Sequence, residues 1–210
     1  MYIISALLVS FFLGSVARDS NNDWEKKVDK NGIQVYTRDV DNSAFKEFKG
    51  DTYIHATIEE ISEIIADVEK YPEWCYKTKA VKIISKNADT IRYYYEADTP
   101  VFLKTRIAWF KCSKETKRQT HEITFSLVDI TPTATVPDDC IVIPIMRGYW
   151  RLKPAKDGIV LVIIQMRTEP GGIIPSWLAN LVVVDSPYIS LKNIRERAEK
   201  IHSNKLLKLK

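Results

Sequence analysis

Alternating apolar and polar residues fill most of the chain between residues 78 and 167, and one long helix is predicted after them. A period of two is typical of strands that bury one face in a sheet. The pattern predicts strands at residues 81–86, 90–96, 104–114, 120–130, 145–153 and 159–168. Their connections are short or rich in turn residues, which favours an antiparallel meander.

The segment before this run mixes two periodicities. Residues 23–28 are expected to form a short opening helix, followed by strands at residues 33–38 and within 45–57. Thr57 and Glu60 have the spacing of a capping box, and the apolar residues after them recur at helical intervals. A helix is therefore predicted to begin after Thr57 and to end near Lys70.

The last helix is predicted to begin near Pro175, directly after Gly171 and Gly172. Apolar residues share one of its faces at steps of three and four: Trp177, Leu181, Val184, Tyr188, Leu191 and Ile194. The charged residues after Ile194 predict a solvated end. Pro187 lies inside the helix, where a proline removes a hydrogen bond and bends the axis at a cost of about 3 kcal/mol. A helix that covers a cavity and must move could use such a bend, whereas a helix that only covers a core gains nothing from it.

These elements predict an α+β fold with one domain at residues 23–202, in which a curved antiparallel sheet wraps around the C-terminal helix. The concave face of such a sheet need not be filled by side chains, and hollow folds of this kind commonly hold apolar ligands. An internal apolar cavity is therefore expected.

Both ends of the chain add information on location. Residues 1–17 have no charged side chain and end in Ser15-Val16-Ala17, which predicts a cleaved signal peptide and export to a periplasm or outside the cell. The net charge of +4 is too small to indicate nucleic acid as a partner. Residues 203–210 form a basic tail, which either lies on an anionic lipid surface or is solvated.

The three cysteines, Cys75, Cys112 and Cys140, fit neither a metal site nor a disulfide framework. One disulfide with one free thiol and three buried thiols are equally compatible with their spacing. No Gly-rich phosphate loop is present.

From residue 24 to 201 the chain resembles the START domains, lipid-transfer modules of the helix-grip superfamily. The resemblance rests on five segments taken in order: residues 31–38, 67–74, the strand with Arg106, 148–152 and 170–180. It implies one lipid held in a tunnel between the sheet and the last helix, with no cofactor, no metal and no catalytic residues.

The resemblance also implies that Arg106 faces the cavity and meets a carboxylate. The family often has Arg-Asp where this chain has Arg106-Ile107, so the acid is missing and Glu96 is the nearest candidate to replace it. Periodicity alone leaves open whether Arg106 or the pair Ile107 and Trp109 points inward.

The other predicted ligand-binding residues are aromatic or apolar and come from the strands, the last helix and one loop: Tyr93, Tyr95, Phe102, Phe110, Trp150, Trp177, Leu181, Val184 and Tyr188. The loop Pro100-Val101-Phe102-Leu103 is unusually apolar for a connection. It is expected either to touch a bilayer as a gate or to form a tight turn on the last helix.

We therefore expect a monomeric carrier of a lipid, fatty acyl or sterol-like ligand that contacts membranes transiently and is not an enzyme. Two alternatives remain: a cyclase or aromatase of the same superfamily, and a module that binds a protein or peptide. His55, His121 and His202 are scattered, and none lies beside a Cys or Ser in a nucleophile arrangement.

Overall fold

The first described residues form a β-hairpin, so the predicted opening helix was wrong. The computed structural model describes residues 24–208, apart from the side chains of residues 176–181. β1 (Glu25–Lys30) and β2 (Ile33–Arg38) pair antiparallel across a two-residue turn. Both turn residues, Asn31 and Gly32, have positive φ (55° and 69°), which is the backbone that an Asn-Gly hairpin turn adopts.

The six strands predicted between residues 78 and 168 are confirmed, as are the two before them. The remaining long strands have these bounds: β3 Glu47–His55, β4 Thr78–Lys86, β5 Thr90–Ala97, β6 Thr105–Thr116, β7 Ile123–Asp129, β9 Ile145–Pro154 and β10 Ile159–Glu169. A turn of 3-10 helix, η2 (Lys156–Gly158), joins β9 to β10. One short strand was missed: β8 (Cys140–Val142), which pairs parallel with β6.

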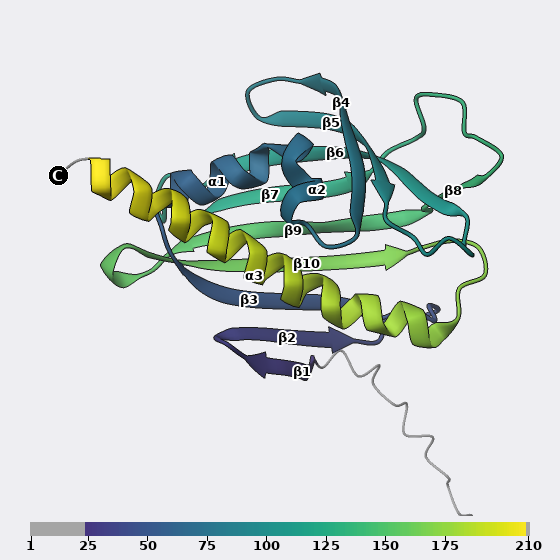
Figure 1. The fold of residues 1–210 in the computed structure, drawn as a ribbon, viewed down its shortest axis with the longest axis horizontal. Helices are drawn as coiled ribbons and strands as arrows, with labels where there is room; N and C mark the ends of the chain where they lie inside the picture. Colours follow the sequence, from purple (N-terminus) through teal and green to yellow (C-terminus); the bar gives the residue numbers. More distant parts are fainter. Residues whose placement is uncertain (1–23, 209–210) are drawn as a thin grey trace, which may run out of the picture.

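The strands form one sheet in the order β1-β2-β3-β10-β9-β7-β6-β5-β4. The long strands pair antiparallel with their neighbours. Because β3 pairs with β10, the first three strands of the chain lie beside its last strand. The sheet is not closed into a barrel, because β1 and β4 are its two edges. This is the curved antiparallel sheet that the alternation predicted (Figure 1).

The predicted capped helix is shorter than expected. In α1 (Ile58–Ala66), Thr57 accepts from the Glu60 backbone and Glu60 accepts from the Thr57 backbone, so the capping box is confirmed. The chain then leaves the helical conformation at Asp67 and continues as η1 (Val68–Lys70) and α2 (Tyr71–Trp74). Pro72 is the second residue of α2, where a proline is tolerated because the N–H groups of a helix's first turn have no partner within the helix.

The helix predicted to begin near Pro175 is α3 (Ser176–Lys208), which crosses the concave face of the sheet diagonally (Figure 1). Leu191, Ile194 and Ala198 are fully buried on the face that packs on β3 and β2. After Ile194 the charged residues are exposed or half-buried, as predicted for a solvated end, and Ala198 is the exception because it packs into the core. The residues of the expected basic tail continue α3 as far as Lys208.

α3 lies very close to β3 where Gly50 meets Pro187. A Cβ atom placed on Gly50 would be 3.0 Å from the Cβ of Pro187 and 2.8 Å from Cδ1 of Leu191. The internal proline, which suggested a bend for motion, is thus buried against the sheet. Its missing N–H leaves the carbonyl of Val183 without its usual helical donor.

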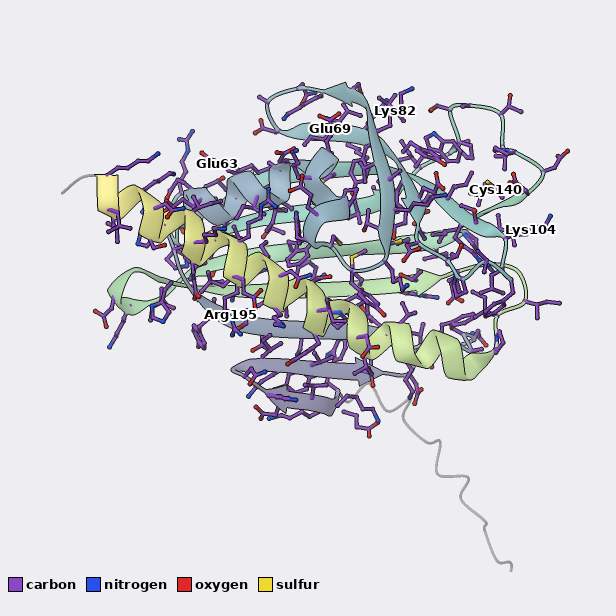
Figure 2. The ribbon with its side chains drawn as sticks, in the orientation of Figure 1. Glu63, Glu69, Lys82, Lys104, Cys140 and Arg195 are labelled. Carbon is purple, nitrogen blue, oxygen red and sulfur yellow. The ribbon has the colours of Figure 1, made fainter. Side chains whose placement is uncertain are left out.

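Further along α3, polar contacts hold its C-terminal half. Arg195 donates from Nη1 to the carbonyl of Asn31 (2.8 Å) and to Oγ1 of Thr52 (3.2 Å), which fixes the helix to the hairpin and β3 (Figure 2). Glu60 of α1 accepts from Lys205 at 3.2 Å and lies 2.9 Å from Nδ1 of His202. None of the helices within residues 24–208 has both the length and the apolar composition of a membrane span.

Candidate functional site

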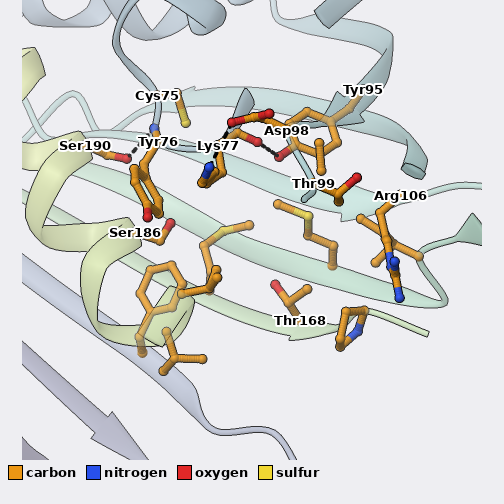
Figure 3. Close-up of a pocket in the computed structure, with 18 of the residues that line it drawn as sticks. Cys75, Tyr76, Lys77, Tyr95, Asp98, Thr99, Arg106, Thr168, Ser186 and Ser190 are labelled. Atoms are coloured by element: carbon orange, nitrogen blue, oxygen red, sulfur yellow. Dashed lines mark hydrogen bonds and ion pairs between the residues drawn. The ribbon is translucent and has the colours of Figure 1, made fainter. Parts of the chain in front are cut away.

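A cavity of about 310 Å³ lies between the N-terminal half of α3 and the concave face of the sheet (Figure 3). Strands β3, β5, β6, β7, β9 and β10 supply inward side chains to its wall. Further wall residues come from α2, α3, the segment at residues 75–77 and the loops at residues 97–103 and 168–174. The C-terminal half of α3 rests directly on the sheet at Leu191, Ile194 and Ala198. The hollow that the sequence predicted is therefore present, and it occupies only one end of the sheet.

Four of the predicted aromatic residues come together in this wall: Tyr93, Tyr95, Phe110 and Trp150. The ring of Phe110 lies 5.4 Å from that of Tyr93 and 5.8 Å from that of Tyr95, measured between centroids. Burial raises the pKa of Tyr93 well above its usual value, so its hydroxyl stays neutral. These side chains give the cavity an apolar wall with phenolic groups in it.

Arg106 also lies in the cavity wall, on the same face of β6 as Ala108, Phe110 and Cys112. Only 3% of its surface is exposed. Nη1 donates to the carbonyl of Lys104 at 2.6 Å, and Nη2 lies 3.5 Å from the carbonyl of Gly171, the limit of a hydrogen bond. Burial lowers the pKa of this guanidinium below its usual value.

Glu96 is not the partner of Arg106, contrary to the sequence-based expectation. It lies opposite Ile107 in the register of β5 and β6, and therefore on the other face of the sheet. There it forms an ion pair with Lys79 (2.6 Å) and accepts a bond from the Tyr94 hydroxyl (3.3 Å). Burial, and after it the nearby carboxylate of Glu96, raises the pKa of Tyr94 to about 12.

Ile107 and Trp109 are also buried, but on the outer face of β6. The ring of Trp109 packs against that of Tyr94 there (5.3 Å between centroids), and the backbone of residues 130–143 donates to the carbonyls of both Ile107 and Trp109 along the edge of β6. In Figure 2 Lys104 and Cys140 mark the end of the molecule where this segment returns to β6.

The prediction for α3 was wrong in its rotation about the helix axis. Val184 and Tyr188 do not line the cavity; the described residues of α3 that do are Val182, Val183, Asp185, Ser186 and Ser190. Tyr188 turns toward the first hairpin, where its hydroxyl accepts from the Asn31 side chain at 3.0 Å. The contact between Pro187 and Gly50 sets this rotation. The side chains of Trp177 and Leu181 lie outside the described residues.

Phe102 lies at the tip of the apolar loop, 72% exposed, and does not line the cavity. Its neighbours Pro100 and Leu103 do. Val101 is fully exposed, as is Ile173 in the loop before α3, and Ile174 next to it lines the cavity. Two loops that border the cavity thus each present an apolar side chain to solvent.

Sequence reasoning missed the polar groups on the side of the cavity away from Arg106. Lys77 and Asp98 form an ion pair at 2.9 Å there, and Ser190 accepts from the Tyr76 backbone at 3.0 Å (Figure 3). The segment around Tyr76 carries no periodicity that marks it as a wall, because it is the short connection between α2 and β4.

The three cysteines are free thiols, and only Cys112 is fully buried. Burial raises the pKa of Cys112 to about 11. Among residues 24–208 no group of three or more potential metal ligands comes together. The predicted signal peptide at residues 1–17 lies outside the described residues.

Comparison with known proteins gives the relationship of this chain. No family model matches the sequence. One relative, the uncharacterized protein PA1579 of Pseudomonas aeruginosa, is 31% identical over 196 residues, which cover 92% of this chain and 96% of that protein. The chain belongs to the family of this relative.

Among solved structures, the STAR-related lipid transfer protein of Xanthomonas axonopodis is 28% identical and superposes with a TM-score of 0.76, over 83% of this chain and 98% of the other. Human StAR-related lipid transfer protein 5 shares the fold at 13% identity, with a TM-score of 0.76 over 88% and 90% of the two chains. The Zhui aromatase/cyclase of Streptomyces is more distant, with 15% identity and a TM-score of 0.50 over 73% and 93%. The START resemblance of the sequence is therefore confirmed at the level of the fold, and the domain has the START-like helix-grip fold.

Proposed function

We propose that this protein binds one hydrophobic ligand in the cavity between α3 and the sheet and carries it between membranes. The observation that carries the proposal is the cavity itself, which is walled by aromatic and aliphatic side chains and left open in a fold whose relatives include named lipid-transfer proteins. Transfer of apolar surface from water into such a wall provides about 25 cal/mol per Å² of binding free energy, before the costs of association.

The size of the cavity favours a slender ligand. Its volume of about 310 Å³ is at the lower end of the range of ligand pockets, which is about 300–1,000 Å³. One acyl chain or a compact ring system suits this volume better than a lipid with two chains. Each methylene group that is buried contributes about 0.8 kcal/mol, so affinity is expected to rise with chain length until the cavity is full.

The exposed apolar side chains at the cavity border support transient contact with a membrane. Val101, Phe102 and Ile173 come from two loops whose next residues line the cavity. A bilayer that accepts these three side chains would bring its acyl region next to the ligand. The protein would act in this way as an exported monomer.

The enzyme alternative receives less support from the cavity. His202 bonds to Glu60 at the far end of α3, and Lys77 and Asp98 in the cavity wall neutralise each other. The best TM-scores are also those of lipid-transfer proteins rather than the cyclase. We therefore propose binding and transfer without catalysis, and without nucleic acid as a partner.

Native mass spectrometry of the full-length protein, purified without detergent, tests the proposal. We expect a co-purifying lipid at one per chain, which organic extraction releases. In Ser186→Trp a bulky ring enters the cavity from α3, so the bound lipid should be lost while the circular dichroism spectrum is kept; Ser186→Ala should retain the lipid.

Three results would contradict the proposal. Equal lipid occupancy in Ser186→Trp and the unaltered protein would place the ligand elsewhere. A protein that neither carries lipid nor takes it up from vesicles would favour a protein-binding module. Conversion of a bound acyl or polyketide chain into a new product would favour an enzyme.

A further inference from the structure

Arg106 is a buried cation without a buried anion. Its side chain is 3% exposed, and its two hydrogen bonds go to carbonyl oxygens, which carry no net charge. A guanidinium has five N–H donors, and one of them, Nε–H, is buried without any partner among the described residues. A buried charge in this condition is destabilising unless an opposite charge and further hydrogen bonds compensate for it.

The other charged groups of the cavity do not supply this compensation. Four line it besides Arg106: Lys46, Lys77, Asp98 and Asp185. Lys77 pairs with Asp98 at 2.9 Å, and Lys46 pairs outside the cavity with Asp39 at 2.5 Å. Asp185 lies on α3 and makes no bond to Arg106. The cavity therefore has one unpaired cationic end.

The backbone around Arg106 is shaped to hold the guanidinium in place. Gly171 and Gly172 both have positive φ (68° and 65°), a conformation that glycine adopts without penalty. This brings the carbonyl of Gly171 toward Nη2, and Gly172 so close that an added Cβ would lie 3.6 Å from the same nitrogen. The Gly-Gly pair of the sequence thus forms a cover over the arginine rather than only a break before a helix.

Two hydroxyl groups lie on the same side of the cavity as Arg106. Thr99 and Thr168 both line it, and Figure 3 places them on the Arg106 side, with Tyr76, Ser186 and Ser190 at the opposite side. The rest of the lining is mostly apolar and includes Tyr93 and Phe110.

We infer that the ligand is a single-chain lipid with an anionic head group, and that its carboxylate or phosphate oxygens pair with Arg106. This inference rests on the proposed function. The planar guanidinium of arginine matches the two oxygens of such a group. The ligand would supply the negative charge and the acceptor for Nε–H that Arg106 does not find among the described residues. The acyl chain then extends along the aromatic wall away from Arg106.

Binding of matched ligands to the unaltered full-length protein provides the first test. A long-chain fatty acid, the alcohol of the same chain and the corresponding amine differ only in the head group. We expect the acid to bind about ten- to a hundredfold more tightly than the alcohol, as charge-assisted hydrogen bonds imply, and the amine to bind most weakly. A lysophosphatidate of the same chain distinguishes a phosphate from a carboxylate as the preferred anion.

The second test replaces the arginine. Arg106→Gln should remove the preference for the acid, with a loss of affinity of about ten- to a hundredfold for the acid and little change for the alcohol. Arg106→Lys keeps the charge and should retain part of the preference. Arg167→Gln is the matched control: Arg167 also has a buried Nε without a partner, but it precedes Thr168 on β10 and points to the opposite face of the sheet.

The outcomes separate this inference from the proposed function. Equal affinity of the acid and the alcohol, unchanged in Arg106→Gln, overturns the anionic head group and leaves a neutral hydrophobic ligand in place. Failure of all three ligands to bind overturns the proposed function as well. If Arg106→Gln does not fold, the comparison of the three ligands on the unaltered protein still decides.

Discussion

Replacing Gly50 by alanine places a methyl group in a close contact between the sheet and α3. The new Cβ would lie 2.8 Å from Cδ1 of Leu191 and 3.0 Å from the Cβ of Pro187. Carbon atoms prefer separations of about 3.5–4.0 Å. Leu191 is fully buried and the ring of Pro187 is stiff, so neither atom moves aside easily.

The expected loss of stability is the difference of two terms. Overpacking a well-packed contact costs about 1–3 kcal/mol. Alanine also restricts the unfolded chain, which stabilises the fold by about 0.4–1 kcal/mol. Taking the middle of each range, the net loss is about 1–2 kcal/mol, and a domain of this size loses about 2–4 °C in Tm per kcal/mol. We expect a fall in Tm of about 2–8 °C.

Thermal unfolding followed by circular dichroism measures this change, and a double-mutant cycle assigns it. Leu191→Val removes the Cδ atoms that meet the new methyl group, so the double variant should lose about 1 kcal/mol less stability than the sum of the single variants. An unchanged or raised Tm in Gly50→Ala, or strictly additive effects with Leu191→Val, would refute the view that α3 is seated directly on Gly50.

Two further predictions concern the contact of Glu60 with α3 and the exposed loop that carries Phe102. Burial raises the pKa of Glu60, but hydrogen bonds from the Thr57 backbone, Lys205 and His202 outweigh this effect, so the pKa lies below its usual value of 4.5. The ionised Glu60 therefore stabilises the fold above pH 4.5, and this stability is lost as the pH falls through the lowered pKa. Glu60→Gln should therefore cost about 1–3 kcal/mol at neutral pH and flatten the acid limb of a urea-unfolding series; parallel pH curves for both proteins would contradict this. Phe102→Glu should slow transfer of a fluorescent lipid between vesicles about tenfold, the equivalent of one lost Phe insertion, whereas Phe102→Leu should not; equal rates for both variants would rule out insertion of this loop.

The sequence was sufficient for most of the sheet, because nearly every long strand buries one face and exposes the other. It failed at the first hairpin, where residues 23–28 were assigned to a helix although Asn31-Gly32 marks a two-residue turn between strands. β8 was missed for a different reason, since three residues are too few to show alternation.

The orientation of Arg106 illustrates a limit of periodicity. Both faces of β6 are buried, because Arg106 and Phe110 face the cavity while Ile107 and Trp109 are buried on the other side. Alternation therefore disappears, and the resemblance to START domains was needed to favour the inward orientation. Glu96 was predicted as the partner of Arg106 but lies on the opposite face of the sheet. It pairs in register with Ile107, and one step along a strand reverses the face to which a side chain points.

The rotation of α3 was likewise beyond the sequence. Apolar residues on this helix serve two surfaces, the core under Leu191 and the wall near Val183, and a single stripe does not separate them. What decides is a contact between Gly50 and Pro187, two residues far apart in the chain. Glycine on a strand and proline in a helix each look unfavourable alone, and only together do they allow the close approach.

The ties at the C-terminal end of α3 have a mechanical consequence. Leu191, Ile194 and Ala198 are buried there, and Arg195 and Lys205 anchor the same stretch to β3 and α1. Val182, in the N-terminal half of α3, is 39% exposed and lines the cavity. The described contacts that hold α3 are thus concentrated in its C-terminal half. We therefore expect cargo to leave by movement of the first turns of the helix, while the last turns stay attached to β3 and α1.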